Sequence, residues 1–553
     1  MAYKFHVDSF SGLIAAGIWT LIIAWIASVA MRGWRARRMF VELNKQGLPM
    51  PKHNLILGHL LTIKPYIDRL PPDAHPAYSF GQIAKESFPD GVYYLDLWPF
   101  FMPLLICTSL TATVDATQKT ALASKKPESL LRWFLPIAGG PNLFTMDEDE
   151  WKTWRGIFNP GFSQAHIVKL VPTIVHEALA YRKLLFEFAE RGEMFRLDEE
   201  TLWFTMDMIG SLVLENSLDS KKTQSPLAVA LLDQLGWHLG DAVINPFVRY
   251  NPRRLAAQWR NSRRMNSYVG KEIDTRYEAY KASLESGHKE DSKSIIGLVL
   301  EGYLKQTGGT QRLPALLDKT FKSYATYQIR TFLFAGHDTT SSSLCHTFYL
   351  LNKNQETLKK LREEHDSVLG NDPAAAASVI SNNPQTLNQL VYTTAVIKEA
   401  MRLFPPASAA RQGIDGVDIM DDKGHRYPTG KTMVWIIHQE IQRSPKYWPK
   451  PDEFVPERWM VGSNDPMYPT KWAWRPFEFG PRNCIGQGLV MSELKIILAL
   501  TIRELDIKDA YGEYDRLYPR KSMVTVAGER AYQFEKGGAH PADHLPCRVY
   551  IRK

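Results

Sequence analysis

The chain has 553 residues, of which 44% are hydrophobic and 23% are charged, a balance typical of globular proteins. Its 15 Trp, 23 Tyr and 25 Phe exclude a disordered protein, and its four scattered cysteines exclude a disulfide scaffold or a cysteine-rich zinc site. The formal net charge of +8 is mild for this length; it fits an anionic membrane surface or an acidic partner protein and does not call for nucleic acid.

The first predicted element is a membrane anchor. The run Phe10–Met31 contains no charged residue, and as a helix it would be about 33 Å long, enough to cross the hydrocarbon core once. Four arginines follow it directly: Arg32, Arg35, Arg37 and Arg38. By the positive-inside rule, these arginines leave residues 32–553 on the cytoplasmic side. A cleaved signal peptide is the alternative, because Ser28-Val29-Ala30 resembles a cleavage site, but the apolar run exceeds the roughly 7–15 residues usual in such peptides.

A joint is predicted after the anchor. The segment Gly47–Pro51 contains two prolines, which fix their own φ angles and restrict the residues before them. No second apolar run of similar length follows. We therefore expect an anchor over residues 1–31, a basic, proline-containing hinge over residues 32–52, and a single domain over residues 53–553.

Helical periodicity dominates the rest of the chain. Apolar residues at three- and four-residue intervals predict helices over Glu177–Phe188, Leu202–Leu214, Leu227–Leu239, Leu255–Glu285, Lys322–Leu351, Glu356–Leu369 and Leu390–Phe404. Short alternating stretches predict strands over Gly91–Leu97, Lys431–Ile437 and Arg548–Ile551, and the proline-rich segment Ser444–Pro476 is expected to be an ordered coil. The predicted fold class is mainly α with small β-sheets.

Several common functional motifs are absent from the sequence. An arginine-rich segment over residues 249–264 could suggest nucleic-acid binding, but a solvated helix face is the simpler interpretation. His176-Glu177 lacks the second histidine of a helical zinc site, since Ala180 stands there. The sequence also has no nucleophile elbow, no P-loop and no glycine-rich dinucleotide motif after a strand, so it predicts no nucleotide-binding fold of its own.

The most informative segment is a glycine-punctuated loop that brings one cysteine to the start of a helix. It contains Phe477, Gly480, Arg482, Cys484 and Gly486. The glycines allow tight turns and close approach to a flat ligand, and a helix N-terminus favours the thiolate form of the cysteine. Arg482 could bind a carboxylate such as a haem propionate. The alternative, a buried cysteine that acts as a small hydrophobic residue, is the usual fate of a lone thiol.

This loop closely resembles the haem-ligand signature F-x-x-G-x-R-x-C-x-G of the cytochrome P-450 family. The resemblance implies haem b as cofactor, Cys484 as the axial iron ligand, and a fold that holds the haem between the cysteine loop and a long oxygen-activation helix. Val490 departs from the alanine of many members, which concerns helix packing rather than the iron.

Other segments match the same family. Glu399 and Arg402 resemble the E-x-x-R helix, and Arg458 lies in a P-E-R-W segment, so the three are expected to form a buried structural ion-pair triad. Two further segments resemble propionate-binding sites of the family and are carried by Trp151, Arg155 and Arg411.

The predicted helix Lys322–Leu351 contains Ala335-Gly336-His337-Asp338-Thr339-Thr340, which breaks local helix rules. It matches the family's oxygen-activation motif, which implies that Asp338 and Thr339 deliver protons to bound oxygen. The resemblance extends from the anchor to about residue 510, and the C-terminal segment, including His540-Pro-Ala-Asp-His544, looks most like fungal members that serve secondary metabolism.

The resemblance implies a membrane-anchored haem-thiolate monooxygenase of the endoplasmic reticulum membrane, single-pass with a cytoplasmic catalytic domain. It would insert one atom of O2 into a hydrophobic small molecule, such as a polyketide or terpenoid, with electrons from a separate NADPH-cytochrome reductase or a cytochrome b-type donor. Basic residues such as Lys152 and Lys495 could face that partner. Two alternatives stay open: a haem-thiolate isomerase, lyase or peroxide-driven enzyme, and a non-catalytic haem sensor.

We expect four segments to line the substrate site: residues 132–144, Phe332–Thr339, Ala407–Ala410 and Val524–Ala527. They are mostly apolar and contain small residues, which favours a large hydrophobic or aromatic substrate.

Overall fold

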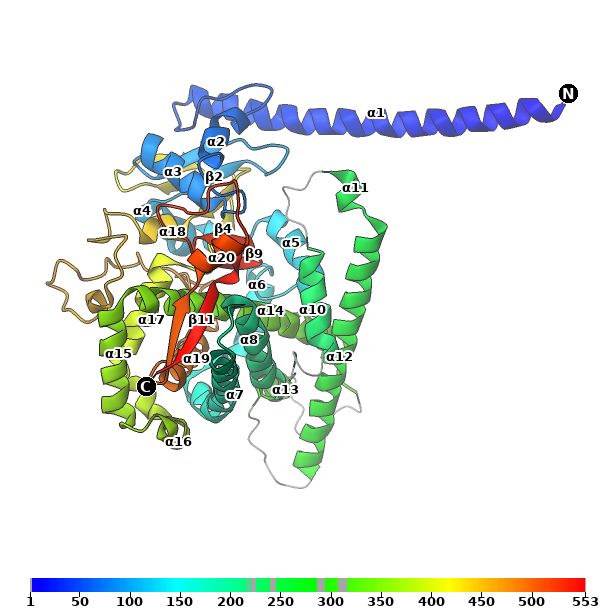
Figure 1. The fold of residues 1–553 in the computed structure, drawn as a ribbon. Helices are drawn as coiled ribbons and strands as arrows, with labels where there is room; N and C mark the ends of the chain where they lie inside the picture. The colour runs from blue at the N-terminus through cyan, green and yellow to red at the C-terminus, as the bar shows by residue number, and fades with distance from the viewer. Residues whose placement is uncertain are drawn as a thin grey trace.

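The computed structural model describes residues 2–215, 218, 220, 225–238, 245–285, 294–306 and 316–552. Helix α1 (Ala2–Lys45) projects from the body as a long rod (Figure 1). From Ile14 onward α1 is long and apolar enough to cross a membrane, and no part of its most apolar stretch is buried against the body. The expected anchor segment is therefore a single exposed helix.

Helix α1 continues without a break through the first part of the expected hinge, as far as Lys45. Its last turns pack on the body, where Phe40 is fully buried and Arg37 forms an ion pair with the buried Asp96. Arg37 also donates to the carbonyl oxygens of Ile56 (3.0 Å) and Trp98 (3.2 Å). Residues 32–45 therefore form a docked helix, and a coil begins only after it.

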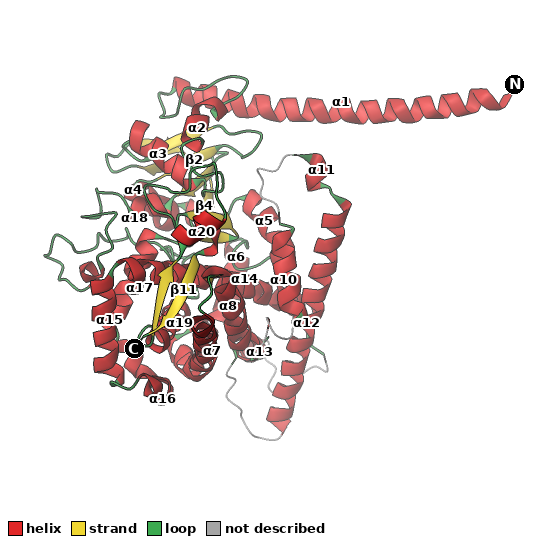
Figure 2. Ribbon diagram, viewed as in Figure 1, coloured by secondary structure: helices red, strands yellow, loops and turns green. Residues whose placement is uncertain are grey.

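Helices make up most of the body (Figure 2). They are α2 (Leu60–Ile67), α3 (Ala77–Ser87), α4 (Leu110–Val114), α5 (Glu128–Ala138), α6 (Glu148–Phe158), α7 (Gln164–Arg191), α8 (Leu197–Leu214), α10 (Pro226–Gly236), α11 (Pro246–Arg249), α12 (Pro252–Glu285), α13 (Ile295–Gln306), α14 (Lys319–Lys353), α15 (Gln355–Leu369), α16 (Ala376–Asn382), α17 (Val391–Leu403), α18 (His438–Gln442), α19 (Gln487–Thr501) and α20 (Tyr511–Leu517). Every helix expected from periodicity is present, although Leu239, at the end of one of them, lies outside the described residues.

The strands form four small sheets. They are β1 (Val92–Leu95), β2 (Leu104–Cys107), β3 (Phe195–Arg196), β4 (Ala409–Gln412), β5 (Asp418–Met420), β6 (Arg426–Pro428), β7 (Met433–Ile436), β8 (Leu505–Asp509), β9 (Gln533–Lys536), β10 (Gly538–Pro541) and β11 (Pro546–Ile551). The largest sheet has the order β1-β2-β7-β4, and its β2–β7 pair is parallel with Leu105 opposite Val434. A second has the order β3-β11-β8, and β9–β10 and β5–β6 are hairpins. The prediction of a mainly helical fold with small sheets is confirmed.

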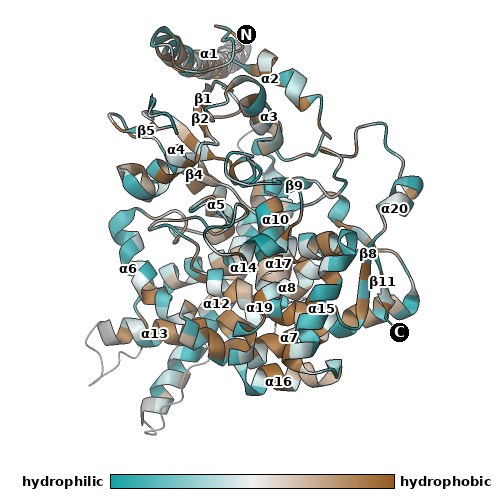
Figure 3. Cartoon of the chain, turned by 90° about the vertical axis from the view of Figure 1, so that its left-hand side faces the viewer, coloured by the Kyte–Doolittle hydropathy of each residue, from teal (hydrophilic) through white to brown (hydrophobic). Residues whose placement is uncertain are grey.

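Helix α14 is the central element, with 35 residues. It packs against α8 on one side and against α12 and α17 elsewhere. Helix α19 is largely apolar in Figure 3, whereas the solvent-facing α15 is largely hydrophilic. The main apolar core surrounds α14 and α19, and this arrangement places α14 opposite the loop that carries Cys484.

Candidate active site

A cavity lies between α14 and the cysteine loop that precedes α19. It contains about 1480 Å³ of empty space, counting its open mouth. One wall comes from α14, through Phe332, Ala335, Gly336 and Thr339. The opposite wall comes from residues 476–486 and the first turns of α19. Two faces from distant parts of the chain therefore enclose one site.

Cys484 differs from the other three cysteines of the chain. Cys107, Cys345 and Cys547 are buried, whereas the Cys484 side chain is exposed and faces the cavity. Burial is the largest effect and raises the pKa of the Cys484 thiol overall, and the N–H groups of Gly486 and Gln487 and the charge of Arg155 offset only part of that rise. The sulfur thus faces the cavity with donors that would stabilise a thiolate but do not by themselves produce one.

Gly480 of this loop has a steric reason that the structure shows. It has φ +88°, and a Cβ there would lie 2.2 Å from the carbonyl oxygen of Thr117. A Cβ at Gly486 would lie 3.8 Å from the Cys484 sulfur, an ordinary contact distance. Within the loop, the Cys484 N–H donates to the carbonyl oxygen of Phe477 (2.8 Å). These contacts fix the direction in which the sulfur points.

Three cationic side chains line one edge of the cavity: Lys126, Arg411 and Arg482. We call them the open cation cluster. Burial lowers the pKa of Arg411, and burial together with the charges of Arg411 and Arg482 lowers that of Lys126 well below its ordinary value. Burial, followed by Arg411, lowers the pKa of Arg482 to about 10. The cluster therefore concentrates positive charge, and Glu478, whose charge acts on Lys126 and Arg411, forms its own hydrogen bonds with other residues.

Arg411 shows this most clearly. Its side chain is fully buried, and its Nη1 donates to the Ala410 carbonyl oxygen at 3.0 Å. Its Nε and Nη2 have no hydrogen-bond partner among the described residues. The nearest acid, Glu478, is instead bonded to Arg475 and, at 3.2 Å, to His438. Buried donors are almost always satisfied, so two orphaned ones at a cavity wall indicate a missing acceptor.

Arg482 is partly satisfied by the chain. It donates to the carbonyl oxygens of Ser124 (2.7 Å) and Met146 (2.6 Å), and its guanidinium lies 4.6 Å from the Trp151 ring centroid. Its Nε has no partner among the described residues. Trp151 therefore supports Arg482 from α6.

Arg155, also on α6, binds the cysteine loop. Its Nη1 donates to the carbonyl oxygen of Asn483 (3.2 Å) and its Nη2 to the side-chain oxygen of the same residue (3.3 Å). Burial lowers its pKa, and the neighbouring Cys484 raises it. Arg155 thus couples α6 to the residue next to the cysteine, and both Trp151 and Arg155 line the cavity.

Asp338 and Thr339, the pair predicted to deliver protons, lie on different faces of α14. Thr339 lines the cavity, and its hydroxyl donates to the Ala335 carbonyl oxygen at 2.8 Å. Asp338 is buried, is not among the described residues that line the cavity, and binds His540 Nε2 through Oδ1 at 3.2 Å. Gly336 allows close packing of α14 on α8, because a Cβ there would lie 2.7 Å from the side chain of Ile209.

The structure brings Glu399, Arg402 and Arg458 together, and we call them the closed ion-pair cluster. All three are fully buried. Glu399 accepts from Arg402 (2.8 and 2.9 Å) and from Arg458 Nε (3.0 Å). It also accepts from Trp459 Nε1 (3.0 Å) and the Val455 N–H (3.0 Å). The remaining arginine donors bind backbone carbonyl oxygens, among them those of residues 442, 449 and 451.

Sequence reasoning missed several cavity residues. Lys126, His438 and Glu478 line the cavity without belonging to a motif. Glu493, in an otherwise apolar part of α19, also lines it; burial raises its pKa to about 7, and the Thr340 hydroxyl donates to it at 3.4 Å. A lone acid on the apolar face of a predicted helix is the signal that could have identified Glu493.

Three of the four segments expected to line the substrate site contribute residues to the cavity. They do so through residues 143–144, through Phe332 to Thr339, and through residues 407–409. Val524–Ala527 contributes none among the described residues, and Val526 packs in a separate small core. Of the basic residues proposed to face a partner, Lys152 pairs with Glu148 on the surface (2.8 Å), whereas Lys495 is half-buried.

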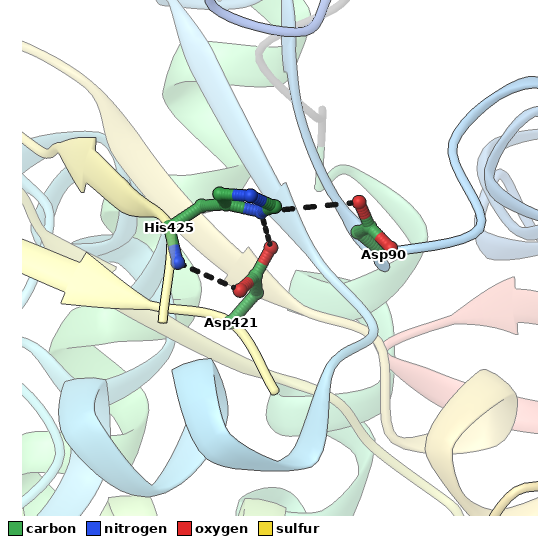
Figure 4. A group of neighbouring side chains, drawn as sticks. All are labelled: Asp90, Asp421 and His425. Atoms are coloured by element: carbon green, nitrogen blue, oxygen red, sulfur yellow. Dashed lines mark hydrogen bonds and ion pairs between the residues drawn. The ribbon is translucent and has the colours of Figure 1, made fainter. Parts of the chain in front are cut away.

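A second group of ionisable side chains, Asp90, Asp421 and His425, lies away from the cavity (Figure 4). Asp421 accepts from the N–H and Nδ1 of His425 and from Tyr427, and Lys423 pairs with Asp90 at 2.7 Å. These bonds stabilise the β5–β6 hairpin, which explains why the three side chains lie close together.

Comparison with known proteins identifies the family of the chain. A family model described as cytochrome P-450 matches residues 94–533. The chain is 38% identical to cytochrome P-450 monooxygenase polC of Polytolypa hystricis over 95% of this chain and 93% of that protein. It is 30% identical to cytochrome P-450 monooxygenase acrF of Aspergillus aculeatus over 88% of this chain and 99% of that protein.

Among solved structures, the fold is similar to the crystal structure of cytochrome P-450DA heme domain, with a TM-score of 0.68. The two chains are 22% identical, and the likeness covers 92% of this chain and 98% of the other. At this identity the comparison shows a common fold.

Proposed function

The chain belongs to the cytochrome P-450 family and is a cytochrome P-450 monooxygenase, and from that premise we propose how its residues divide the work. Cys484 would hold the iron of a haem, the open cation cluster would bind the haem carboxylates, and Thr339 with Asp338 would handle protons in the cavity. The observation that carries this proposal is the exposure of one thiol to a cavity whose edge has buried, unpartnered cationic donors.

The residues of the cavity fit haem b. When bound, haem supplies the binding and reductive activation of O2, which side chains alone do not provide. Arg411 offers two donors that have no partner among the described residues, and Arg482 and Lys126 add charge beside it. Arg155 and Trp151 hold the loop and the Arg482 side chain in place. Phe477, Gly480 and Gly486 shape the loop so that the sulfur faces a flat ligand.

Cys484 acts as a thiolate. Burial raises the pKa of the unligated thiol, so the thiolate would form on binding iron, since a coordinating thiol is deprotonated. Three features would stabilise it there: the N–H groups of Gly486 and Gln487, the charge of Arg155, and the position just before the N-terminus of α19. A thiolate ligand increases electron density at haem iron and favours O–O cleavage.

Thr339 and Asp338 supply protons. Thr339 presents a hydroxyl to the cavity directly from α14, where it can hold a water by hydrogen bonding. Asp338 lies one residue earlier and carries a carboxylate that can accept and release a proton. This division favours oxygen activation over an isomerase or a peroxide-driven reaction, which need no such delivery.

We assign electron supply to a separate protein, an NADPH-cytochrome reductase or a cytochrome b-type donor. The sequence has no nucleotide-binding motif. An acidic partner would approach the side of the Cys484 loop, where exposed Lys152 on α6 is a candidate contact.

The remaining assignments concern place and substrate. Helix α1 anchors the protein in the endoplasmic reticulum membrane, with residues 1–31 in lipid and the domain over residues 53–553 in the cytoplasm. The cavity walls are mostly apolar, so the substrate is a hydrophobic molecule. The relatives named above are fungal monooxygenases, which supports a step in fungal secondary metabolism.

The test is the spectrum of the reduced carbon monoxide complex. Cys484→Ser removes the thiolate, so the thiolate-type absorption band should disappear; Cys345→Ser, at a buried cysteine, is the matched control and should keep it. NADPH consumption with purified reductase then separates a monooxygenase from a haem sensor, which binds haem without turnover. Retention of the thiolate-type band in Cys484→Ser would contradict the proposal.

A further inference from the structure

Four ionisable side chains form a continuous buried chain that ends at Asp338. His540 Nε2 lies 3.2 Å from Asp338 Oδ1, and His540 Nδ1 lies 2.9 Å from Asp198 Oδ1. The other oxygen of Asp198 accepts from His544 Nδ1 at 2.7 Å. Three separate parts of the fold meet here: α14, the first turn of α8, and the β10 strand with the turn after it.

His540 lies between two carboxylates and is itself fully buried. Although burial lowers its pKa, the charges of Asp198 and Asp338 raise it to about 10. The other groups near it are neutral or already paired: burial lowers the pKa of His337 and of His346, and Ser341 donates to Asp198 at 2.9 Å. The surroundings therefore favour an imidazolium at position 540.

The far end of the chain reaches the surface. The His544 side chain is 13% exposed, and its Nε2 lies 3.3 Å from the ammonium of the exposed Lys536. His544 Nδ1 donates to the Asp198 carboxylate, so its Nε2 is the nitrogen that faces Lys536 and solvent. The connected path thus begins in solvent at residues 536 and 544 and ends beside the predicted oxygen-activation motif.

The hairpin between β9 and β10 is shaped for this contact. A Cβ on Gly537 would lie 2.9 Å from Asp338 Oδ1, and a Cβ on Gly538 would lie 2.5 Å from Oδ2. Glycine at both positions lets the hairpin lie directly against the carboxylate.

We propose that His540 delivers protons to Asp338, and that Asp198 and His544 connect His540 to solvent. This inference rests on the proposed function, in which Asp338 and Thr339 bring protons to the cavity. It assigns a role to the C-terminal segment that resemblance alone left without one.

The proton steps balance as follows. The Nε2–H bond of the His540 imidazolium breaks and an O–H bond forms on Asp338 Oδ1, which leaves neutral His540 with its proton on Nδ1. Asp338 turns toward the cavity, releases the proton there and returns as a carboxylate. A proton from solvent first binds His544 Nε2, and the resulting imidazolium passes its Nδ1 proton to Asp198, which leaves His544 neutral. Asp198 holds that proton only in passing, because, although burial raises its pKa, His540 and His544 keep that pKa far below the ordinary value. The His540 ring reorients so that its bare nitrogen accepts the proton from Asp198, and both carboxylates and the His540 imidazolium are restored.

The decisive variant is His540→Gln in the full-length, reductase-coupled enzyme. Product formation should slow about tenfold or more, and the solvent isotope effect should rise, because a positioned acid is lost. Asp338→Asn should also slow turnover, and the double variant should be no slower than Asp338→Asn alone, since both residues serve one path. His365→Gln, at an equally buried histidine bonded to Thr393, is the matched control.

A readout independent of turnover uses the histidine nitrogen resonances of the isotope-labelled protein. One resonance should stay in the imidazolium range at pH 9 and be absent from His540→Gln. If that variant fails to fold, His544→Gln at the partly exposed end should still slow product formation and be non-additive with Asp338→Asn.

Two results would overturn this inference and leave the proposed function intact. One is a wild-type rate and isotope effect in His540→Gln while Asp338→Asn is slow; the other is a double variant slowed by the product of the single effects. Unchanged rate and coupling in both Asp338→Asn and Thr339→Ala would instead remove the proton role in the proposed function, and this inference with it.

Discussion

The closed ion-pair cluster and the open cation cluster both bury guanidinium groups, yet they satisfy them in opposite ways. In the closed cluster, Glu399 accepts five hydrogen bonds from Arg402, Arg458, Trp459 and Val455. In the open cluster, Arg411 has two donors without partners among the described residues. An arginine whose donors are all hydrogen-bonded within the chain stabilises the fold, whereas a buried arginine with unbonded donors indicates a ligand.

The largest effect is expected from a substitution that breaks the closed ion-pair cluster. Glu399→Gln leaves two buried arginines without a counter-charge, which costs about 3–5 kcal/mol in the free energy of unfolding. Little folded protein should accumulate, as measured by thermal unfolding and haem content after expression. Glu453→Gln, at an exposed acid paired with Lys450, is the control and should unfold like the wild type. Normal stability of Glu399→Gln would contradict a structural role.

The next effect concerns an acid of the cavity wall. Because burial raises the pKa of Glu493 from 4.5 to about 7, the folded protein loses stability as pH rises from 4.5 through 7. The loss is about 3 kcal/mol at full ionisation. Glu493→Gln should remove this part of the pH dependence in denaturant unfolding of the haem-free protein. An identical pH profile in both proteins would mean that Glu493 is solvated.

A smaller effect is expected at Arg482, a member of the open cation cluster whose donors are only partly satisfied by the chain. Arg482 binds backbone carbonyl oxygens and the face of Trp151, but its Nε has no partner in the part of the chain that the structure describes. Arg482→Lys keeps the charge and loses the planar, multiple donors, so it should cost about 1–2 kcal/mol of stability and weaken haem retention at the same time. Thermal unfolding with and without haem separates the loss of stability from the loss of haem retention. A loss of stability alone would mean that Arg482 serves only the fold, and a loss of haem retention alone would mean that it serves only the ligand.

Local patterns predicted what depends on neighbouring residues in the chain. The periodicity of Lys322–Leu351 anticipated α14, and the spacing from Phe477 to Gly486 anticipated a loop that presents Cys484 to a cavity. Both features are set within about thirty residues, so sequence spacing carries them.

Features that depend on distant partners were not predictable in the same way. The hinge expected over residues 32–52 is helical up to Lys45 because Arg37 finds Asp96, 59 residues away. His540 binds Asp198 and Asp338, which are 342 and 202 residues distant. The unpartnered state of Arg411 is likewise a property of packing, which no motif encodes.

The most direct test of the central claim is a matched comparison of Arg411→Met and Arg402→Met. Arg411→Met should leave the haem-free protein at least as stable as the wild type, because it removes a buried charge without a partner, and should speed haem dissociation by roughly 10–100-fold. Arg402→Met should destabilise the haem-free protein strongly, because it breaks a satisfied pair. Equal loss of haem-free stability in the two variants, with unchanged haem dissociation from Arg411→Met, would contradict the account.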